Sequence, residues 1–448
     1  IFYCMLTLEN LLRRRHVHFI GIGGVSMSAL AEYLRARGVR VTGCDAVRGV
    51  YAARLAAKGV EIGVPRLDGA FDDLPLVIVN SAIRRDDPSL TEAMAKGCDV
   101  ARREEALGAV FNSFGKSVAV CGTHGKTTTA AMIVHGLMSA GLTPAAFVGG
   151  VMKETGGNFV DGKDICVAEA CEYRAGFMTL KPDINCMLNV DYDHADFYSG
   201  KEAAARAFRD FAGNTKGVNI VCGDDDTLKT FGGVTFGMGA DNYYSARGVW
   251  GKNGYYTFTF TEGGKPRFTA TLSVPGLHNV TNALCACAAL RVLGLGHGEI
   301  KRAAETFTGV DRRFTVYKGR FSVVTDYAHH PAEIAAALKT AGEYGFGKIR
   351  LVFQPHTYTR TRALFGGFLK ALDADEIYIV PTYAARENAI EGYESKDLAD
   401  ALKREGKTVF YFDDMAALAE TLKRKSADGD AVMLVGAGDV DALKDMLV

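Results

Sequence analysis

The feature that most constrains the fold of this chain is a glycine-rich turn at residues 121–129. The turn reads Cys-Gly-Thr-His-Gly-Lys-Thr-Thr-Thr. An apolar run at 118–120 predicts a strand before it, and the apolar spacing in 126–140 predicts a helix after it. Free backbone N–H groups and the helix dipole favour phosphate at such a helix start. The segment therefore predicts a nucleotide site.

Two side chains of this turn suit a nucleotide. Lys126 can reach the outer phosphates, and Thr127 can ligate Mg²⁺. The spacing GxxGKT is shorter than the general P-loop pattern GxxxxGK[ST], so an ordinary glycine turn is the alternative. The flanking strand and helix favour the nucleotide, and the predicted phosphate site comprises Gly122, Thr123, His124, Gly125, Lys126, Thr127 and Thr128.

A second glycine-rich turn, at 21–24, joins a predicted strand at 16–20 to a predicted helix at 25–37. It resembles a dinucleotide fingerprint but lacks the last glycine. Asp45 follows the next predicted strand, at 40–43, where an acid can meet a ribose hydroxyl. The turn can serve packing alone, NAD or the diphosphate of a UDP-sugar. The other phosphate turn, at Gly122, favours the UDP-sugar.

Strand and helix patterns alternate along most of the chain, which favours parallel sheets covered on both faces. Between 234 and 273 the pattern changes to alternating aromatic residues and threonines, typical of antiparallel hairpins. With 448 residues the chain is too long for one core. We therefore predict three α/β domains. They are a Rossmann-like domain at 1–112, a P-loop-type central ATPase domain with an added antiparallel edge at 113–313, and a Rossmann-like domain at 314–448.

The composition argues against several classes of partner. The 52 basic and 52 acidic residues give a formal net charge of +0, unlike a nucleic-acid-binding or polybasic membrane surface. No apolar run approaches the length that spans a bilayer. The 10 cysteines include no CxxC pair. We expect a reduced, cytoplasmic protein with no nucleic acid or membrane partner.

Polar residues follow two further predicted strands of the central segment. Glu169 follows the run at 164–168, and His194 follows the run at 184–190. We expect these strands to be neighbours, so that both side chains reach one crevice. Glu169 is then a candidate Mg²⁺ ligand and His194 a candidate for metal or phosphate. The alternatives are a helix-capping acid and a structural histidine.

The second half of the chain holds further candidates. Asn279 and Asn282 share one face of a helix start, where they either contact an adenine or cap the helix. Arg313 offers a guanidinium for phosphate, and Arg360 and Arg362 can hold a carboxylate or phosphate bidentately. Plain surface charge is the alternative for all three arginines.

Together these motifs resemble the Mur ligase family, in order and over nearly the whole chain. The segments GTHGKTT and DYAHHP are specific as a pair, and the opening GIGGVSMSALA favours the alanine-adding members. The matching motifs are HFIGIGGVSMSALAEYL, CGTHGKTTT, EACEYR, NVDYDHADFY, PGLHNVTNA, GVDRRF, DYAHHPAEI and QPHTYTRT.

The resemblance implies an ATP-dependent ligase of peptidoglycan synthesis. It would activate the carboxylate of UDP-N-acetylmuramate as an acyl phosphate and join L-alanine to it, with ATP and Mg²⁺. The residues that the resemblance implies for binding the UDP-sugar are Gly21, Gly23, Gly24, Val25, Ser26, Asp45 and Ser81. The metal set is Thr127, Glu169 and His194. ATP would also contact His278, Asn282, Arg313 and Asp326, and the catalytic set is Lys126, His194, Arg313, His329 and Arg360.

Three alternatives stay open at this point. One is a murein-peptide recycling ligase of the same family, which would use a tripeptide in place of alanine. Another is an NAD-dependent dehydrogenase built on the turn at 21–24, which leaves the motif at 122–128 without a role. The third is a non-catalytic nucleotide-binding regulator, which would show no alanine-dependent phosphate release.

Overall fold

The computed structural model describes residues 6–47, 49–64, 74–81, 83–385 and 387–448. The chain forms two compact units. The first comprises Ile1–Asn189, Ala205–Val234 and Ala289–Leu295, and the second comprises Val190–Ala204, Thr235–Ala288 and Gly296–Val448. The boundaries expected after residues 112 and 313 stay a prediction.

The first unit opens with a parallel sheet. Its strands lie in the order β3 (Glu61–Gly63), β2 (Arg40–Cys44), β1 (His16–Ile20), β4 (Leu76–Val79) and β5 (Asp99–Arg102). Helix α2 contacts β2, and its Met27, Leu30 and Leu34 are buried at the predicted helical spacing. The helices of this segment are α1 (Leu8–Leu12), α2 (Val25–Ala36), α3 (Val50–Ala57), α4 (Pro88–Ala95) and α5 (Arg103–Phe111).

A second sheet of the first unit carries the phosphate turn. Its strands lie in the order β11 (Val218–Cys222), β10 (Ile184–Met187), β6 (Ser117–Cys121), β9 (Cys166–Glu169), β7 (Ala145–Met152) and β8 (Gly157–Val160). All are parallel except β8. The helical elements are α6 (Lys126–Ser139), η1 (Tyr173–Thr179), α7 (Lys201–Gly213), η2 (Leu228–Thr230) and α8 (His278–Val292), of which α7 and α8 continue into the second unit.

The second unit contains the antiparallel hairpins expected between 234 and 273. Strand β12 (Val234–Gly237) pairs with β13 (Tyr244–Lys252), and β13 continues antiparallel to β14 (Tyr255–Glu262) and β15 (Lys265–Thr271). Threonine pairs such as Thr257–Thr271 bond across β14 and β15. Helix α9 (His297–Thr306) packs against β15.

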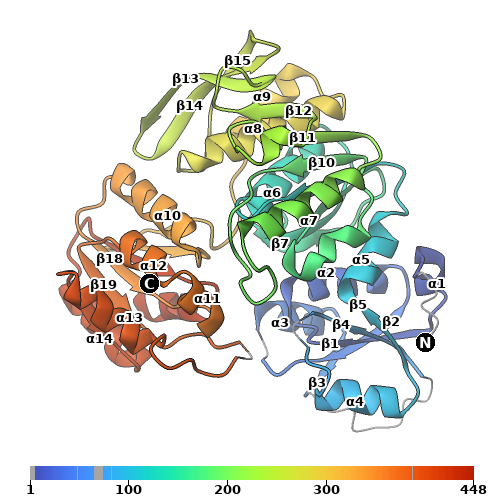
Figure 1. Ribbon diagram of the computed structural model, residues 1–448, viewed down its shortest axis with the longest axis horizontal. Helices are drawn as coiled ribbons and strands as arrows, with labels where there is room; N and C mark the ends of the chain where they lie inside the picture. Colours follow the sequence, from blue (N-terminus) through green and yellow to red (C-terminus); the bar gives the residue numbers. More distant parts are fainter. Residues whose placement is uncertain (1–5, 48, 65–73, 82, 386) are drawn as a thin grey trace. The chain divides into compact units, whose positions relative to one another are not determined.

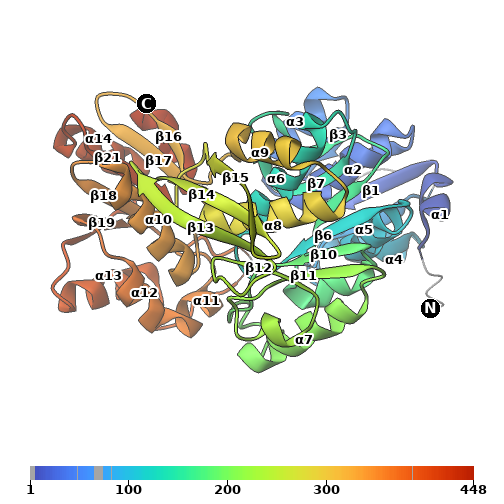
Figure 2. The same ribbon diagram turned by 90° about the horizontal axis from the view of Figure 1, so that it is seen from above.

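The rest of the second unit is a sheet with helices on both faces (Figure 1, Figure 2). Its strands lie in the order β16 (Thr315–Tyr317), β17 (Ser322–Asp326), β21 (Ala431–Val435), β18 (Ile349–Phe353), β19 (Glu376–Ile379) and β20 (Val409–Tyr411). Only β16 runs antiparallel to its neighbour. The helical elements are α10 (Pro331–Tyr344), α11 (Tyr358–Ala363), α12 (Phe365–Ala371), α13 (Ser395–Arg404), α14 (Met415–Lys425), η3 (Val440–Leu443) and α15 (Lys444–Leu447).

Alternate residues of each central strand in this sheet face opposite cores. Leu351 and Phe353 pack against α10, α12 and α13, whereas Val352 packs against α14. A strand covered on both faces is mostly apolar, and the one charged residue of β18, Arg350, is paired with Glu376 and Asp430. The parallel sheets and the antiparallel hairpins agree with the predicted α/β class.

The structure corrects one expectation about strand order. Strand β6 lies between β9 and β10, so the strands before Glu169 and His194 are not neighbours. Strand β10 also ends at Met187, well before His194, which lies in a loop with a positive φ of 55°. The apolar run to Val190 continues past the last ladder hydrogen bond, and apolar pattern alone does not show where pairing stops.

Among the described residues, none of the helices is long and apolar enough to cross a membrane.

Candidate functional site

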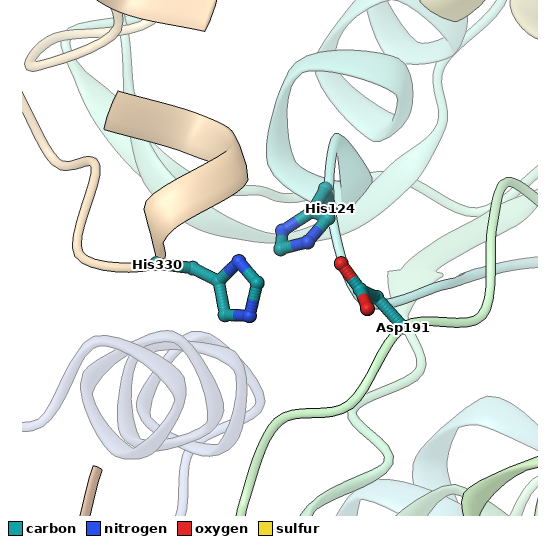
Figure 3. A group of neighbouring side chains, drawn as sticks. All are labelled: His124, Asp191 and His330. Atoms are coloured by element: carbon teal, nitrogen blue, oxygen red, sulfur yellow. The ribbon is translucent and has the colours of Figure 1, made fainter. Parts of the chain in front are cut away.

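The turn before α6 has a backbone that glycine makes possible. Gly122 and Gly125 have φ values of 138° and 86°, and a Cβ at Gly122 would lie 2.8 Å from the Cβ of Leu188. Asn189 fixes the turn, because its Oδ1 accepts from the His124 backbone N–H at 2.8 Å and its Nδ2 donates to the His124 carbonyl at 3.1 Å. Figure 3 draws the His124 side chain in this turn.

Lys126 is held by four oxygen atoms at the first position of α6. Its Nζ donates to the carbonyls of Gly122 and Thr123 at 2.5 and 3.0 Å, and to both carboxylate oxygens of Glu172 at 3.1 and 3.0 Å. Burial opposes the charged ammonium, but the Glu172 carboxylate outweighs it and raises the pKa of Lys126. A permanently charged ammonium therefore lies at the predicted phosphate site. Glu172 was not predicted, although it belongs to the quoted motif EACEYR.

Glu169 ends β9 and lies against the backbone of β7. The Gly149 N–H donates to its Oε1, and a Cβ at Gly149 would lie 2.6 Å from both of its carboxylate oxygens. The negative charge of Glu169 also contributes to the raised pKa of Lys126, so the two groups are close. Thr127 follows Lys126 and is buried. Hard oxygen ligands of this kind suit Mg²⁺.

The turn at 21–24 is closed by the predicted acid. One oxygen of Asp45 accepts from the Gly23 N–H at 2.7 Å, and the other accepts from the Val47 N–H at 3.1 Å. A Cβ at Gly23 would lie 2.9 Å from that carboxylate. Asp45 therefore has a structural task in this turn. Gly24 is the N-cap of α2 and offers no side-chain cap to the helix N–H groups.

The two serines predicted for this turn meet a pair of charged residues at the start of α5. Ser26 Oγ accepts from Arg103 Nη1 at 3.2 Å, and Ser81 Oγ lies 3.4 Å from both carboxylate oxygens of Glu104. Sequence reasoning missed Arg103 and Glu104 because a pair of charges at a helix start is a common surface pattern. The carbonyl of Val25, another predicted residue, accepts from the amide of Asn158 at 2.6 Å.

In the second unit, Arg360 pairs with Asp193, an acid that was not predicted. Arg360 donates from Nε and Nη2 to the two oxygens of Asp193 at 2.9 and 3.2 Å, and both side chains are buried. Burial opposes the charge on Asp193, but Arg360 and His194 outweigh it and hold its pKa below the ordinary 3.8. His356 accepts from Arg360 through Nδ1 at 2.9 Å. Burial and this guanidinium lower the pKa of His356 to about 3, so its ring is neutral.

His329 is also neutral. Burial lowers its pKa to about 4 against the opposing charge of Glu333. Its Nδ1 lies 3.0 Å from the Tyr327 carbonyl, which can only accept, so Nδ1 carries the proton and Nε2 is an acceptor. The ring centroids of His329 and His356 are 5.9 Å apart. The motifs DYAHHP and QPHTYTRT therefore meet beside the Asp193–Arg360 pair, as their places after strands suggested.

Two other polar side chains lie near this cluster within the second unit. His330 begins α10 and its Nε2 lies 3.2 Å from the Tyr192 carbonyl. A carboxylate oxygen of Asp191 lies within 4.8 Å of a ring nitrogen of His330, and Figure 3 labels both residues. Neither was among the predicted site residues.

The remaining predicted residues make contacts within the chain or begin a helix. Asn282 Nδ2 donates to Asn279 Oδ1 at 2.9 Å, and Asn279 in turn donates to the Pro275 carbonyl, so the amides brace the start of α8. Asp326 accepts from the N–H groups of Phe314 and Ala328, both at 2.8 Å. His278 lies at the first position of α8. Arg313 lies over the Tyr327 ring, 5.2 Å from its centroid.

Comparison with known protein families finds similarity along most of the chain. Residues 16–114 match the description "Mur ligase family, catalytic domain", residues 120–290 match "Mur ligase middle domain" and residues 312–438 match "Mur ligase, glutamate ligase domain". The chain is 36% identical to a UDP-N-acetylmuramate–L-alanine ligase of Acetivibrio thermocellus, over 97% of this chain and 96% of that protein. It is 38% identical to one of Lachnospira eligens, over 95% and 96%.

Solved structures give the same result for the fold. A UDP-N-acetylmuramate-alanine ligase of Thermotoga maritima has a TM-score of 0.85 and 30% identity, covering 96% of this chain and 98% of that one. A murein peptide ligase of Psychrobacter arcticus has a TM-score of 0.73 over 97% and 98%. Its 23% identity supports similarity of fold alone.

Proposed function

Because this chain belongs to the Mur ligase family, we propose that it uses ATP to join L-alanine to the carboxylate of UDP-N-acetylmuramate in peptidoglycan synthesis. The observation that carries the proposal is the turn at 121–129, which places a charged, largely buried lysine at the start of α6, where a helix N-terminus favours phosphate. The activity named for the relatives supports the choice of acceptor and amino acid.

The reaction would proceed in two steps. A carboxylate oxygen of UDP-N-acetylmuramate takes the γ-phosphoryl group of ATP, and ADP leaves. The alanine amine then attacks the carbonyl of this acyl phosphate, and the tetrahedral intermediate loses phosphate and a proton to give the amide. Phosphoryl transfer depends on positioning and charge neutralisation. Lys126 supplies a positive charge for the transferring group, and removal of one such contact typically costs about 2.7–4 kcal/mol of barrier.

The residues around Lys126 fit Mg²⁺. Thr127 and Glu169 would hold the ion, and His194 would serve a second one. Bound Mg²⁺ neutralises charge on the phosphates during transfer. The contact of Glu169 with the Gly149 N–H orients its carboxylate in advance of binding.

The resemblance to the family supplies the proposed roles of the other predicted residues. His278, Asn282, Arg313 and Asp326 would contribute to ATP binding, and His329 and Arg360 would lie near the alanine. The neutral Nε2 of His329 can accept a proton, whereas the Arg360 guanidinium is already paired with Asp193. Arg360 therefore contributes through that pair.

The direct test is phosphate release from ATP and Mg²⁺ with UDP-N-acetylmuramate and a panel of amino acids, including a murein tripeptide. Release with L-alanine alone supports the proposal, and release only with the tripeptide supports the recycling ligase. Borohydride added without alanine should reduce the acyl phosphate to an alcohol. Arg313→Ala should suppress that alcohol, whereas Arg360→Ala should permit it and slow its consumption by alanine. No alcohol in the native enzyme, with no carboxylate oxygen passed to phosphate, excludes the intermediate.

A further inference from the structure

Arg103 places a positive charge beside Ser26, close after the glycine turn at 21–24. It occupies the first position of α5, and only 13% of its side chain is exposed. Its Nη1 donates to the hydroxyl of Ser26 at 3.2 Å. Ser26 is the second residue of α2, directly after the turn. The guanidinium therefore lies beside the helix start to which the turn leads.

The contacts of Arg103 leave most of its hydrogen-bonding capacity unused. A guanidinium has five N–H donors, and among the described residues its one hydrogen bond is to Ser26. Its one ion pair there is with Glu104 at 3.8 Å, longer than a hydrogen bond. That carboxylate also faces the Ser81 hydroxyl. Glu104 supplies a counter-charge at a distance that leaves the remaining guanidinium donors available to a further anion.

Arg103 lies near two elements, η1 and α2. On one side Arg103 meets η1, because a Cβ at Gly176 would lie 3.5 Å from Nη2. Thr179 Oγ1 of the same element donates to the Glu104 carbonyl at 2.8 Å and holds the start of α5. The Ser26 contact places the guanidinium beside the first turn of α2, the helix that follows the turn 21–24. An anion held by Arg103 would therefore lie near a helix start, which favours negative charge.

We propose that Arg103 binds the diphosphate of the UDP-sugar at the turn 21–24, and this rests on the proposed function. Phosphate oxygens match the planar guanidinium fork bidentately. Ser26 fixes the orientation of the fork, while the 3.8 Å spacing to Glu104 leaves the other donors available to the substrate. Arg103 is thus a substrate-binding residue that acts on binding and leaves the ATP turn unaffected.

Calorimetry with UDP-N-acetylmuramate, UDP and uridine tests the proposal. Arg103→Ala should weaken the first two ligands about ten- to a hundredfold and leave uridine unchanged. Arg103→Lys, which keeps the charge without the fork, should fall between Arg103→Ala and the native chain. Arg102→Ala is the matched control, because Arg102 is the preceding residue, is exposed and should bind as the native chain does.

Each other outcome has a distinct meaning. Unchanged UDP affinity in both Arg103 variants overturns the proposal, and loss for UDP-N-acetylmuramate alone would assign Arg103 to the sugar carboxylate and also overturn it. Unchanged melting temperatures show that the variants fold. If Arg103→Ala does not fold, Arg103→Lys supplies the test. Failure of the native chain to bind UDP-N-acetylmuramate would count against the proposed function, whereas normal native turnover with unaffected variants counts against Arg103 alone.

Discussion

At the scale of single residues, the Asp193–Arg360 pair shows how much one buried contact contributes. Asp193→Asn would leave a buried guanidinium without its counter-charge, so we expect a loss of about 3–5 kcal/mol in stability. The measurement is the apparent melting temperature of both proteins at neutral pH. Asp226→Asn is the control, because Asp226 pairs with Lys229 on an exposed surface. This substitution should change the stability by less than about 1 kcal/mol.

The same pair predicts a pH dependence of stability. The folded-state pKa of Asp193 lies below its ordinary value of 3.8, so the unfolded chain takes up this proton first as the pH falls. The stability from the pair is fully present above pH 3.8 and is lost as the pH falls through the folded-state pKa. The melting-temperature difference between native protein and Asp193→Asn should therefore be constant from pH 8 to about 5 and shrink in stronger acid. A difference that stays constant into strong acid would contradict this assignment.

Gly149 gives a residue-scale test of the proposed metal ligand. Its N–H donates to Glu169, and a Cβ would lie 2.6 Å from both carboxylate oxygens, so Gly149→Ala must displace that carboxylate. We expect Gly149→Ala to raise the Mg²⁺ concentration needed for half-maximal ligation about tenfold or more, as loss of a ligand's supporting contact does. Glu169→Gln should act in the same direction.

The control for that experiment is Gly213→Ala. Gly213 ends α7, and a Cβ there would have nothing within 4 Å. Its Mg²⁺ titration should match that of the native enzyme. A Gly149→Ala titration that also matches would make Glu169 a structural residue.

At the scale of elements, two helix glycines predict opposite effects of the same substitution. Alanine exceeds glycine in helix propensity by about 1 kcal/mol. In α6, however, a Cβ at Gly136 would lie 2.4 Å from Cδ1 of the buried Leu290, so Gly136→Ala should overpack and cost about 1–3 kcal/mol. In α10, a Cβ at Gly342 would meet nothing within 4 Å, so Gly342→Ala should stabilise by up to about 1 kcal/mol. An increase in melting temperature for both variants would show that helix propensity decides both sites.

At the scale of the whole molecule, the two glycine turns belong to different sheets of the first unit. Lys126 follows β6, whereas the turn at 21–24 follows β1. Lys126→Ala should therefore reduce ligation by about 10²–10³-fold through lost charge stabilisation, and should leave the dissociation constant of UDP-N-acetylmuramate nearly unchanged. Calorimetry and steady-state rates measure the two quantities. Loss of UDP-sugar binding with ATP turnover retained would reverse the roles of the turns.

The sequence by itself determined the features that depend on neighbouring residues. Glycines that need a positive φ, such as Gly122 and Gly125, and apolar spacing such as Met27, Leu30 and Leu34 are local properties. The strand at His16–Ile20 was predicted at its observed limits for the same reason. The α/β class and the phosphate turn before α6 follow from such patterns, because short-range sterics and hydrophobic periodicity decide them.

Only the tertiary structure decided which distant side chains meet. Arg360 and Asp193 are 167 residues apart, Arg103 and Ser26 are 77 apart, and Gly149 and Glu169 are 20 apart. None of these pairs has a sequence signature, because strand order and helix packing bring them together. The wrong expectation about the strands before Glu169 and His194 has the same cause. Chain order does not give lateral order in a parallel sheet, where crossover helices let a later strand lie on either side.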